Sequence, residues 1–514
     1  MSGKSSNNKR IAKNTLMLYI RMFFLMVINI YTTRVVLQAL GVEDYGIYHV
    51  VGGIVAIFAV ISRSLSSANS RFLNFEMGRG NRTRLCAVFS TGVSIQIVLA
   101  ITIAFLTEVI GTWFLSNKMV IPKDRLIAAN WVFQFSIITF CINLISVPYN
   151  AAIIAHEKMK TFAYISIYEG LAKLLICFLV MVSSVDKLII YAALMCAIQL
   201  SVRFVYTFYC KRHFVECTYS FIFDKTLLKE LFSYAGWNFI GASSVVLRTQ
   251  GGNILINLFS GPAVNAARGV ANQVNFAVTG FSNNFMTAVN PQITKSYAAG
   301  EISYMTTLVN QSARLSFYML LFVSLPIIVN IDFILSVWLK EIPDRTTIFV
   351  ILTMAFTMVE SLSNPLITAQ QATGKMRNYQ LLVGGINLLN IPVSYMFLNY
   401  GANPEVFLYV AIVLSIVCLA ARLFMLHLNT GFEILTFLQN VIINCFLVTI
   451  LSLVVPLFMS SFFDESWLSF FYLSFICLLS TLIMIYFIGC NKDEKSMIKS
   501  KVVVLLNKIK AKTV

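Results

Sequence analysis

Residues 146–160 read SVPYNAAIIAHEKMK, and residues 363–377 read SNPLITAQQATGKMR. The two stretches share six identities in fifteen positions at an offset of 217 residues, and the last position exchanges Lys for Arg. Each stretch joins two apolar runs, which we count as spanning segments four and five, and ten and eleven. A shift of six segments is even, so both copies have the same orientation. This predicts two six-helix bundles related by an axis along the membrane normal.

The composition of the chain excludes a soluble protein. Of the 514 residues, 58% are hydrophobic and only 12% are charged, and the mean hydropathy is +0.78. Soluble domains carry about 25% charged residues. Apolar runs of about 20 residues recur along the whole length, which indicates membrane helices rather than the short alternating strands of a β-barrel. We therefore expect an all-α integral membrane protein.

Hydropathy and flanking charge predict about fourteen spanning helices, of which the second, seventh, eighth and tenth are unusually polar. The predicted helices cover residues 14–40, 45–70, 85–112, 126–155, 161–183, 187–210, 231–258, 264–292, 304–330, 346–372, 379–399, 405–428, 434–460 and 467–490. The predicted domains are a cytoplasmic N-terminal segment (1–13), a first six-helix bundle (14–212), a cytoplasmic linker (213–230), a second six-helix bundle (231–430), two additional helices (431–490) and a basic cytoplasmic tail (491–514).

The distribution of lysine and arginine predicts the orientation. Of 39 such residues, 24 fall in segments predicted to be cytoplasmic, six on the opposite side and nine within helices. The positive-inside rule then places both termini in the cytoplasm. This distribution accounts for the net charge of +17 without nucleic acid as a partner. Most of the ten cysteines lie in apolar runs and are expected to be buried thiols rather than disulfides or metal ligands.

Eight of the nine basic residues inside predicted helices are arginines. A charge at a lipid-facing helix centre costs about 2.5–3.5 kcal/mol, so these side chains are expected to face the protein interior, water or the headgroup boundary. A guanidinium binds phosphate through two parallel hydrogen bonds and stays charged when desolvated. For Arg203, Arg314 and Arg422, near predicted helix ends, we favour a structural role. Lys173 lies four residues after Glu169 and is predicted to form a local salt bridge.

Polar residues form stripes on several predicted helices, most clearly on the eighth, where they recur at steps of three and four. Such a stripe cannot face lipid, so it lines a water-filled cavity or hydrogen-bonds to another helix. We favour a central cavity, because equivalent helices of both halves carry these faces. Gly251-Gly252 on the seventh helix is expected to be a flexible or unwound point. The predicted substrate-binding residues are Arg21, Arg34, Arg63, Arg248, Arg268, Asn272, Asn275, Glu360 and Asn364.

The sequence lacks the signs of a membrane enzyme. It contains no D-x-D metal pair, no H-E-x-x-H, no phosphate-binding glycine loop and no nucleophilic-serine elbow. Its largest polar connection runs from about residue 211 to 230 and is predicted to be cytoplasmic. We therefore expect no catalytic residues, no metal site and no enzymatic activity. A cavity lined by amides, hydroxyls and guanidinium groups suits a hydroxyl-rich, anionic substrate.

Residues 40–48 read LGVEDYGIY and follow a first helix with a basic N-terminal flank. This stretch resembles the junction of polysaccharide exporters, and the Pro148 and Pro365 joints are similar to that group. The resemblance covers nearly the whole chain. It is to the Wzx-type O-antigen and capsular polysaccharide flippases, within the superfamily that includes the MATE drug exporters and the lipid II flippases.

The resemblance implies a MATE-like, V-shaped pair of bundles with a central cavity. It implies that undecaprenyl-pyrophosphate-linked oligosaccharide moves outward across the bacterial inner membrane by alternating access. Arginines in the cavity of lipid II flippases lie on the first, second, seventh or eighth helices, which here carry Arg21, Arg34, Arg63, Arg248 and Arg268. MATE exporters commonly use a cation-coupling acid in the first helix, and residues 14–40 contain none.

Other interpretations stay open at this point. The main alternative is a cation-coupled drug or metabolite exporter of the same fold, and a membrane enzyme such as a polymerase or acyltransferase is the next. The expected partners are the lipid-linked oligosaccharide, the lipid bilayer and polysaccharide polymerase or assembly proteins. We expect a monomer without a cofactor. The sequence leaves open the sugars that are carried and whether protons, sodium or voltage provide the driving force.

Overall fold

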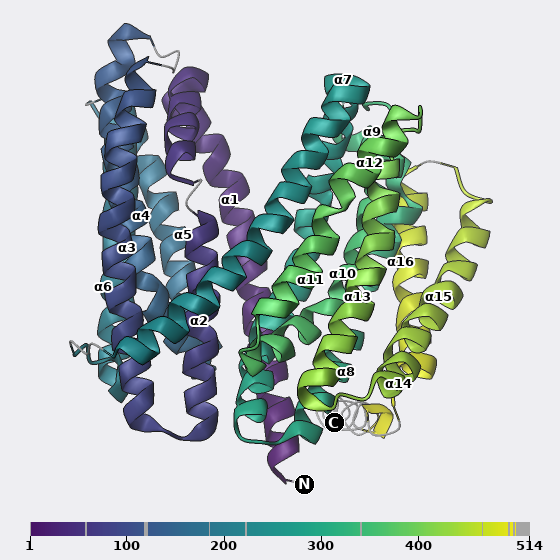
Figure 1. Cartoon of the computed structure of the whole chain (residues 1–514). Coiled ribbons are helices and arrows are strands. Elements are labelled where there is room, and N and C mark those ends of the chain that lie inside the picture. Colours follow the sequence, from purple (N-terminus) through teal and green to yellow (C-terminus); the bar gives the residue numbers. More distant parts are fainter. Residues whose placement is uncertain are drawn as a thin grey trace, which may run out of the picture. The chain divides into compact units, whose positions relative to one another are not determined.

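The computed structural model describes residues 2–56, 59–117, 122–184, 186–220, 224–339, 342–464, 466–491, 494–496 and 499. Within these ranges all regular secondary structure is helical (Figure 1). The α-helices are α1 (Ser2–Ala56), α2 (Ala59–Arg79), α3 (Arg82–Asn117), α4 (Leu126–Ala155), α5 (Met159–Val182), α6 (Lys187–His213), α7 (Lys225–Ala298), α8 (Ile302–Val329), α9 (Ile331–Trp338), α10 (Thr346–Thr373), α11 (Arg377–Leu388), α12 (Asn390–Asn399), α13 (Val406–Thr430), α14 (Ile434–Phe437), α15 (Asn444–Ser460) and α16 (Trp467–Met484).

Short helical turns accompany these helices. They are the 3-10 turns η1 (Lys123–Arg125) and η2 (Val215–Cys217) and the π-helical turns η3 (Leu438–Ile443) and η4 (Ile485–Gly489). The two π-turns continue directly into α15 and out of α16, so the last two predicted spans, 434–460 and 467–490, are each continuous helical segments.

Eleven helices among the described residues are long and apolar enough to cross a membrane. The prediction of an all-helical, multi-pass membrane protein is confirmed. The three further predicted spans, 45–70, 231–258 and 264–292, are also helical wherever they are described, but their composition is more polar. Those three segments carry much of the polar set from which the substrate-binding residues were predicted.

Two long helices each contain one glycine at which the helical conformation is interrupted. Gly41 in α1 has φ 79° and ψ 169°, and Gly261 in α7 has φ 79° and ψ 179°. Side chains with a Cβ rarely adopt this conformation, so glycine is required at both positions. Gly41 belongs to the LGVEDYG stretch, and Gly261 follows it by 220 residues. The corresponding break in both halves agrees with the internal repeat.

The expectation of an unwound point at Gly251-Gly252 is wrong, because both residues lie within regular α7 and the interruption occurs at Gly261. These glycines serve close packing instead. A Cβ on Gly252 would lie 2.3 Å from the ring of Phe407, and one on Gly251 would lie 2.7 Å from Ile391. Small residues of this kind let helices approach each other closely in a membrane protein.

The chain clusters into two compact units. The first contains residues 1–243, 287–305 and 371–381. In it α4 packs against α6, α1 against α5 and α3 against α4 (Figure 1, purple to blue). Its apolar core includes Val132, Phe133 and Leu188, which are fully buried.

An ion-pair group closes one end of this first unit. The guanidinium of Arg125 donates to the carboxylates of Asp44, which follows the break in α1, and Asp186, the N-cap of α6. The Arg125 Nη1 to Asp186 Oδ2 distance is 2.7 Å. Because one arginine connects the ends of three helices, the LGVEDYG turn is fixed to α4 and α6.

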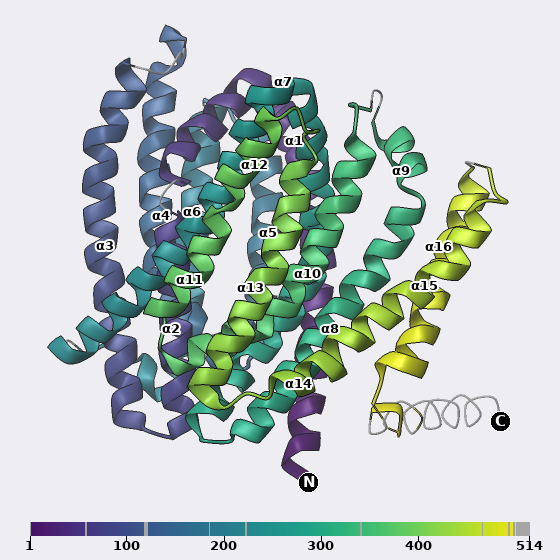
Figure 2. The same cartoon turned by 45° about the vertical axis from the view of Figure 1, so that its right-hand side comes forward.

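The second unit contains residues 244–286, 306–370 and 382–514. In it α12 packs against α13, and α15 runs beside α16 (Figure 2, yellow). The guanidinium of Arg314 on α8 donates to Asn491 at 3.0 Å and to Glu494 at 2.5 Å. Arg314 therefore has the structural role that was expected for it.

Candidate functional site

The described residues of the predicted site fall into three places in the fold. Arg21 lies in the first unit, on α1. Arg248, Arg268, Asn272 and Asn275 lie on α7 and Glu360 and Asn364 on α10, in the second unit. Arg34 and Arg63 are on α1 and α2, but their side chains lie outside the described part of the structure.

Arg21 is half-buried on α1, with its guanidinium 4.4 Å from the centre of the Phe162 ring. Its Nε atom is buried and has no hydrogen-bond partner. Glu169 on α5 is an acid whose charge acts on Arg21. The Oε1 atom of Glu169 lies 2.7 Å from Lys173 Nζ, so the predicted local salt bridge is confirmed. Arg203, in the same unit, donates to the carbonyl of Ile145, which is a structural role.

Arg248 lies in a tight side-chain environment inside the second unit. Its Nη1 donates to Asn387 Oδ1 at 2.7 Å, and the Phe356 ring centre is 4.9 Å from its guanidinium carbon. Only 9% of the residue is exposed. Glu360 is the acid whose charge acts on Arg248. Arg248 is thus positioned by a neutral amide and an aromatic face rather than by a direct ion pair.

Arg268 is buried in the second unit and has only part of its hydrogen-bonding capacity satisfied. The residue is 4% exposed, its Nη2 donates to the Thr249 carbonyl at 3.2 Å, and its guanidinium lies 4.5 Å from the Phe407 ring centre. Its Nη1 is buried without a hydrogen-bond partner. Among the described residues, no carboxylate lies within salt-bridge distance of it. A buried cation with an unsatisfied donor is energetically costly, which makes Arg268 a candidate for binding an anion.

Glu360 and Asn364 lie one turn apart on α10. Glu360 Oε1 accepts a hydrogen bond from Ser415 at 2.7 Å, and Arg422 Nη1 lies 3.9 Å from the same oxygen. Arg422 also donates to Ser363 at 2.8 Å, so its expected structural role is borne out. Asn364 is half-buried, and its backbone carbonyl accepts a hydrogen bond from the Thr368 hydroxyl at 3.2 Å. Glu360 is therefore partly neutralised within its own unit.

The polar stripe after Gly261 divides into different environments. Asn272 is exposed, whereas Asn275 accepts a hydrogen bond from Thr357 on α10 at 2.7 Å. Ser282 is buried, and its hydroxyl has no hydrogen-bond partner. The stripe is thus part interhelical hydrogen bonding and part accessible polar surface.

A recess of about 400 Å³ lies on α7 on both sides of Gly261. Four carboxamides line it together with two aliphatic side chains. The lining residues are Gln250, Asn253, Ile254, Asn257, Leu258 and Asn265. Gln250, Asn253 and Asn257 follow the helical spacing of one face, so the sequence contained a signal, but none of the four amides was among the predicted substrate-binding residues. We call it the amide recess.

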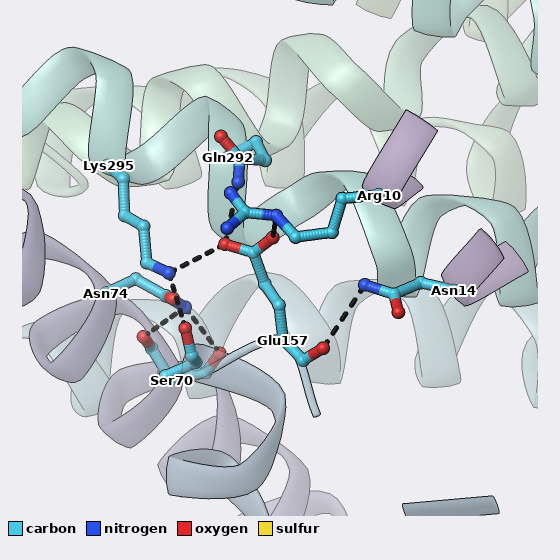
Figure 3. Close-up of polar contacts among 8 residues, drawn as sticks. Arg10, Asn14, Ser70, Asn74, Glu157, Gln292 and Lys295 are labelled. Atoms are coloured by element: carbon cyan, nitrogen blue, oxygen red, sulfur yellow. Dashed lines mark hydrogen bonds and ion pairs between the residues drawn. The ribbon is translucent and has the colours of Figure 1, made fainter. Parts of the chain in front are cut away.

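A second polar cluster was not predicted from the sequence. It is centred on the buried carboxylate of Glu157, in the turn between α4 and α5 (Figure 3). Glu157 Oε2 is 2.8 Å from Arg10 Nε, and Glu157 Oε1 is 2.8 Å from Lys295 Nζ. The same Oε1 accepts a hydrogen bond from Gln292 Nε2 at 2.7 Å. Its backbone carbonyl accepts from Asn14 at 3.2 Å. The cluster joins the start of α1, the α4–α5 turn and the end of α7.

The turn at Glu157 has an unusual backbone for a non-glycine residue. Glu157 has φ 57°, in the left-handed region, and its N–H donates to Ile154 while Lys158 N–H donates to Ile153. This is the Schellman arrangement that ends many helices, usually with glycine at the left-handed position. Since a left-handed non-glycine residue costs about 1–2 kcal/mol, the contacts of the Glu157 carboxylate must offset this strain.

Arg71 on α2 forms a comparable cluster at the end of α10. Its Nη2 donates to the Ala372 carbonyl at 2.9 Å and its Nε to the Gln371 carbonyl at 3.3 Å. The guanidinium lies over the rings of Phe72 and Phe75, at 4.5 Å from each centre. Arg71 was not predicted as a site residue, because this contact joins positions 300 residues apart along the chain.

Residues 9–297, more than half of the chain, match the family described as polysaccharide biosynthesis protein. The chain belongs to this polysaccharide biosynthesis family. Residues 245–396 also match the MatE family. Uncharacterized membrane protein EpsK of Bacillus subtilis (strain 168) is 22% identical over 292 residues, which cover 56% of this chain and 57% of EpsK. The match thus spans little more than half of that relative.

Solved structures show the fold of this family member. A multidrug-resistance MATE transporter of the MOP superfamily, in an outward-facing conformation, has a TM-score of 0.70 at 11% identity and covers 83% of this chain and 96% of its own. A mutant of the Vibrio cholerae MATE transporter VcmN also has a TM-score of 0.70, at 13% identity, with coverages of 85% and 100%. The MATE fold is confirmed. The solved structures that share this fold are those of transporters.

Proposed function

We propose that this polysaccharide biosynthesis protein is a flippase for undecaprenyl-pyrophosphate-linked oligosaccharide, the repeat unit of an O-antigen, capsule or exopolysaccharide. The observation that carries the proposal is Arg268, a buried guanidinium whose Nη1 has no hydrogen-bond partner. Arg248 is the charged group that acts on it, which gives two like charges within one polar region. A pyrophosphate satisfies the free donor and neutralises both arginines.

The amide recess supports the oligosaccharide part of the proposal. Carboxamides both donate and accept hydrogen bonds, which matches the hydroxyl groups of a sugar. The four amides of the recess are Gln250, Asn253, Asn257 and Asn265. The amides lie beside Ile254 and Leu258, so the recess offers hydrogen-bonding groups together with apolar surface. The four amides favour a sugar over a hydrophobic drug, because pockets for drug-like molecules carry only a few polar groups.

A cation-coupled drug exporter is the weaker candidate for this chain. The expected first span, residues 14–40, has no Asp or Glu to bind a coupling cation. Moving one negative charge outward across an inside-negative membrane releases about 2.3 kcal/mol per 100 mV. A pyrophosphate therefore supplies part of the driving force itself, and proton or sodium coupling adds to it where present.

The proposal includes the location and the partners of the protein. We place the chain in the bacterial inner membrane with both termini in the cytoplasm, on the strength of the lysine and arginine distribution. We propose that it acts as a monomer and hands its substrate to polysaccharide polymerase or assembly proteins outside the membrane. Arg21, Arg34, Arg63, Asn272, Asn275, Glu360 and Asn364 are the further proposed substrate contacts.

The test is export of surface polysaccharide in cells that lack their own flippase. Arg268→Ala is expected to reduce export at least tenfold at normal protein level. Arg268→Lys keeps the charge but loses the planar guanidinium, so its export is expected to lie between that of Arg268→Ala and that of the wild type. Lys229→Ala is the control, because Lys229 is an exposed basic residue on the same helix, α7. Full export by Arg268→Ala would contradict the arginine mechanism, and drug resistance without polysaccharide export would favour the alternative.

A further inference from the structure

Two basic side chains make matching contacts at two helix ends in the first unit. Arg71 Nη2 donates to the carbonyl of Ala372, at the end of α10, at 2.9 Å. Lys295 Nζ donates to the carbonyl of Ala155, at the end of α4, at 2.5 Å. Ala155 and Ala372 are 217 residues apart, which is the offset of the internal repeat. The two acceptors are therefore the same position in the two halves.

The donors come from repeat-related helices as well. Arg71 lies near the end of the second predicted span and Lys295 just after the eighth, and these spans correspond under the repeat. Each basic residue thus binds the helix end of the opposite repeat: the first repeat supplies Arg71 to α10, and the second supplies Lys295 to α4. We call this reciprocal pair of contacts the paired cap.

Close backbone packing brings the two donor helices together at this end. A Cβ on Gly78, near the end of α2, would lie 2.6 Å from the Lys295 carbonyl oxygen and 2.8 Å from Ala298 Cβ. The Phe75 and Tyr297 rings are in contact beside it, with centroids 6.4 Å apart. The ends of α2 and α7 consequently touch through their backbones, so the paired cap holds four helix ends in one place.

We infer that the paired cap is the cytoplasmic gate of the transporter, with Arg71 and Lys295 as the residues that hold it shut in the conformation seen here. The inference rests on the proposed function, because the side on which the caps lie is assigned by the proposed orientation. For a substrate to enter from the cytoplasm, the two repeats must separate at these helix ends. The cap contacts join the repeats there, and they must break for that separation.

The nature of the contacts suits a gate that opens reversibly. A cation at a helix C-terminus binds carbonyl groups that have no partner within the helix, so it adds stability to the closed state. In the α10 cap the acceptors of Arg71 are neutral. In the α4 cap Lys295 also contacts the Glu157 carboxylate at 2.8 Å (Figure 3). The two caps therefore differ in strength, and the Lys295 cap is the stronger.

The glycine after α10 fits the same assignment. Gly374 has φ 76°, and a Cβ there would lie 2.8 Å from Arg71 Nη2. The position needs glycine for its backbone conformation and also for access of the guanidinium to the carbonyls. At the matching position of the other repeat, Glu157 replaces glycine and supplies an acid to the donor instead.

The experiment measures distances across each cap in the full chain, reconstituted in nanodiscs without substrate. Spin labels are attached to pairs of exposed positions, Thr83 with Asn378 across the Arg71 cap and Lys160 with Glu301 across the Lys295 cap. The background lacks the ten native cysteines and is chosen to unfold at the wild-type temperature. Arg71→Gln and Lys295→Met are each compared with Arg79→Gln, an exposed arginine on the same helix as Arg71.

Each cap variant is expected to raise the ratio of long to short distances about tenfold, in both label pairs at once, because a gate opens as one body. Arg79→Gln is expected to leave both distributions unchanged. A change confined to the label pair beside the substitution would show two local helix caps and overturn the gate. Unchanged distances in both variants would overturn it as well. The readout needs no substrate, so altered distances in a chain that gives drug resistance without polysaccharide export would reject the proposed function and leave the gate standing.

Discussion

Glu157 and Gly374 occupy the same position in the two repeats, and both adopt the left-handed backbone conformation, with φ 57° and 76°. One repeat uses the residue that fits this conformation without strain, and the other uses an acid whose carboxylate contacts Arg10, Gln292 and Lys295. The strain at Glu157 therefore indicates that the contacts of its carboxylate contribute more to this turn than an unstrained backbone would.

Replacing Glu157 by Gln is expected to destabilise the protein by about 2–4 kcal/mol, because removing one partner of a buried ion pair leaves the other charges uncompensated. Glu157→Gly relieves the backbone strain but removes the same carboxylate, so it is expected to lie between Gln and the wild type. The apparent unfolding temperature in detergent measures both. Glu301→Gln, at an exposed position, is the control, and equal stability of all four proteins would contradict the role given to the Glu157 carboxylate.

Gly252→Ala is expected to be strongly destabilising, by about 2 kcal/mol or more, because overpacking a filled interior forces its neighbours to move. The new Cβ would lie 2.3 Å from Phe407 and 2.7 Å from Arg268 Nη1. Gly236→Ala on the same helix meets no atom within 4 Å and is expected to be neutral or slightly stabilising, because alanine favours a helix. The measurement is the unfolding temperature of the two variants. Similar unfolding temperatures would contradict close packing at Gly252.

Gly41→Ala and Gly261→Ala are each expected to cost about 1–3 kcal/mol, the strain of a residue with a Cβ in a region nearly confined to glycine. Neither position is crowded, since an added Cβ would meet nothing within 4 Å. Any loss therefore comes from the backbone alone. Gly385→Ala on α11, with equally open space and no positive φ, is the control, and its stability should not fall. Thermal unfolding of the three variants decides the matter.

Stability is expected to fall in acid through Glu216, which lies after α6 and outside the spanning helices. Burial opposes ionisation of Glu216, but hydrogen bonds from His156 and the backbone, with the charges of His156 and Arg82, outweigh it and hold its pKa below the usual 4.5. A carboxyl whose pKa is lowered by folding contributes stability above its unfolded pKa, and that stability is lost as the pH falls through the folded pKa.

The measurement is the unfolding temperature of the wild type and Glu216→Gln between pH 7 and pH 3. The wild type is expected to lose more stability over the acid part of this range, because the variant has no carboxyl to protonate. His156→Gln should reduce the difference, since it removes a hydrogen bond from the charged form of Glu216. Parallel curves for wild type and Glu216→Gln would exclude this contribution.

The sequence predicted the helices more accurately than the contacts between them. The described parts of the fourteen expected spans are mostly helical, because apolar length and flanking charge act locally. The unwound point was misplaced at Gly251-Gly252, since glycine serves close packing as readily as a backbone break, and only the structure separates these uses at Gly261.

The Glu157 cluster could not be found from local pattern, because Lys295 reaches Glu157 across 138 residues of chain. A signal did exist in the repeat itself, where an acid aligns with Gly374 at the helix-ending position. For Arg248 and Arg268 the sequence identified buried cations but not their partners. Arg248 has Asn387 and Arg268 keeps a free donor, and this difference depends on side-chain packing from other helices.

The composition of the first unit has a consequence for biosynthesis. Its residues include 371–381, although most of it is complete by residue 243. The acceptor carbonyl of Ala372 therefore leaves the ribosome only after about three quarters of the 514 residues have been made. Until then Arg71 lacks the backbone acceptor that it has in the folded chain, so this contact between the two repeats forms late in synthesis.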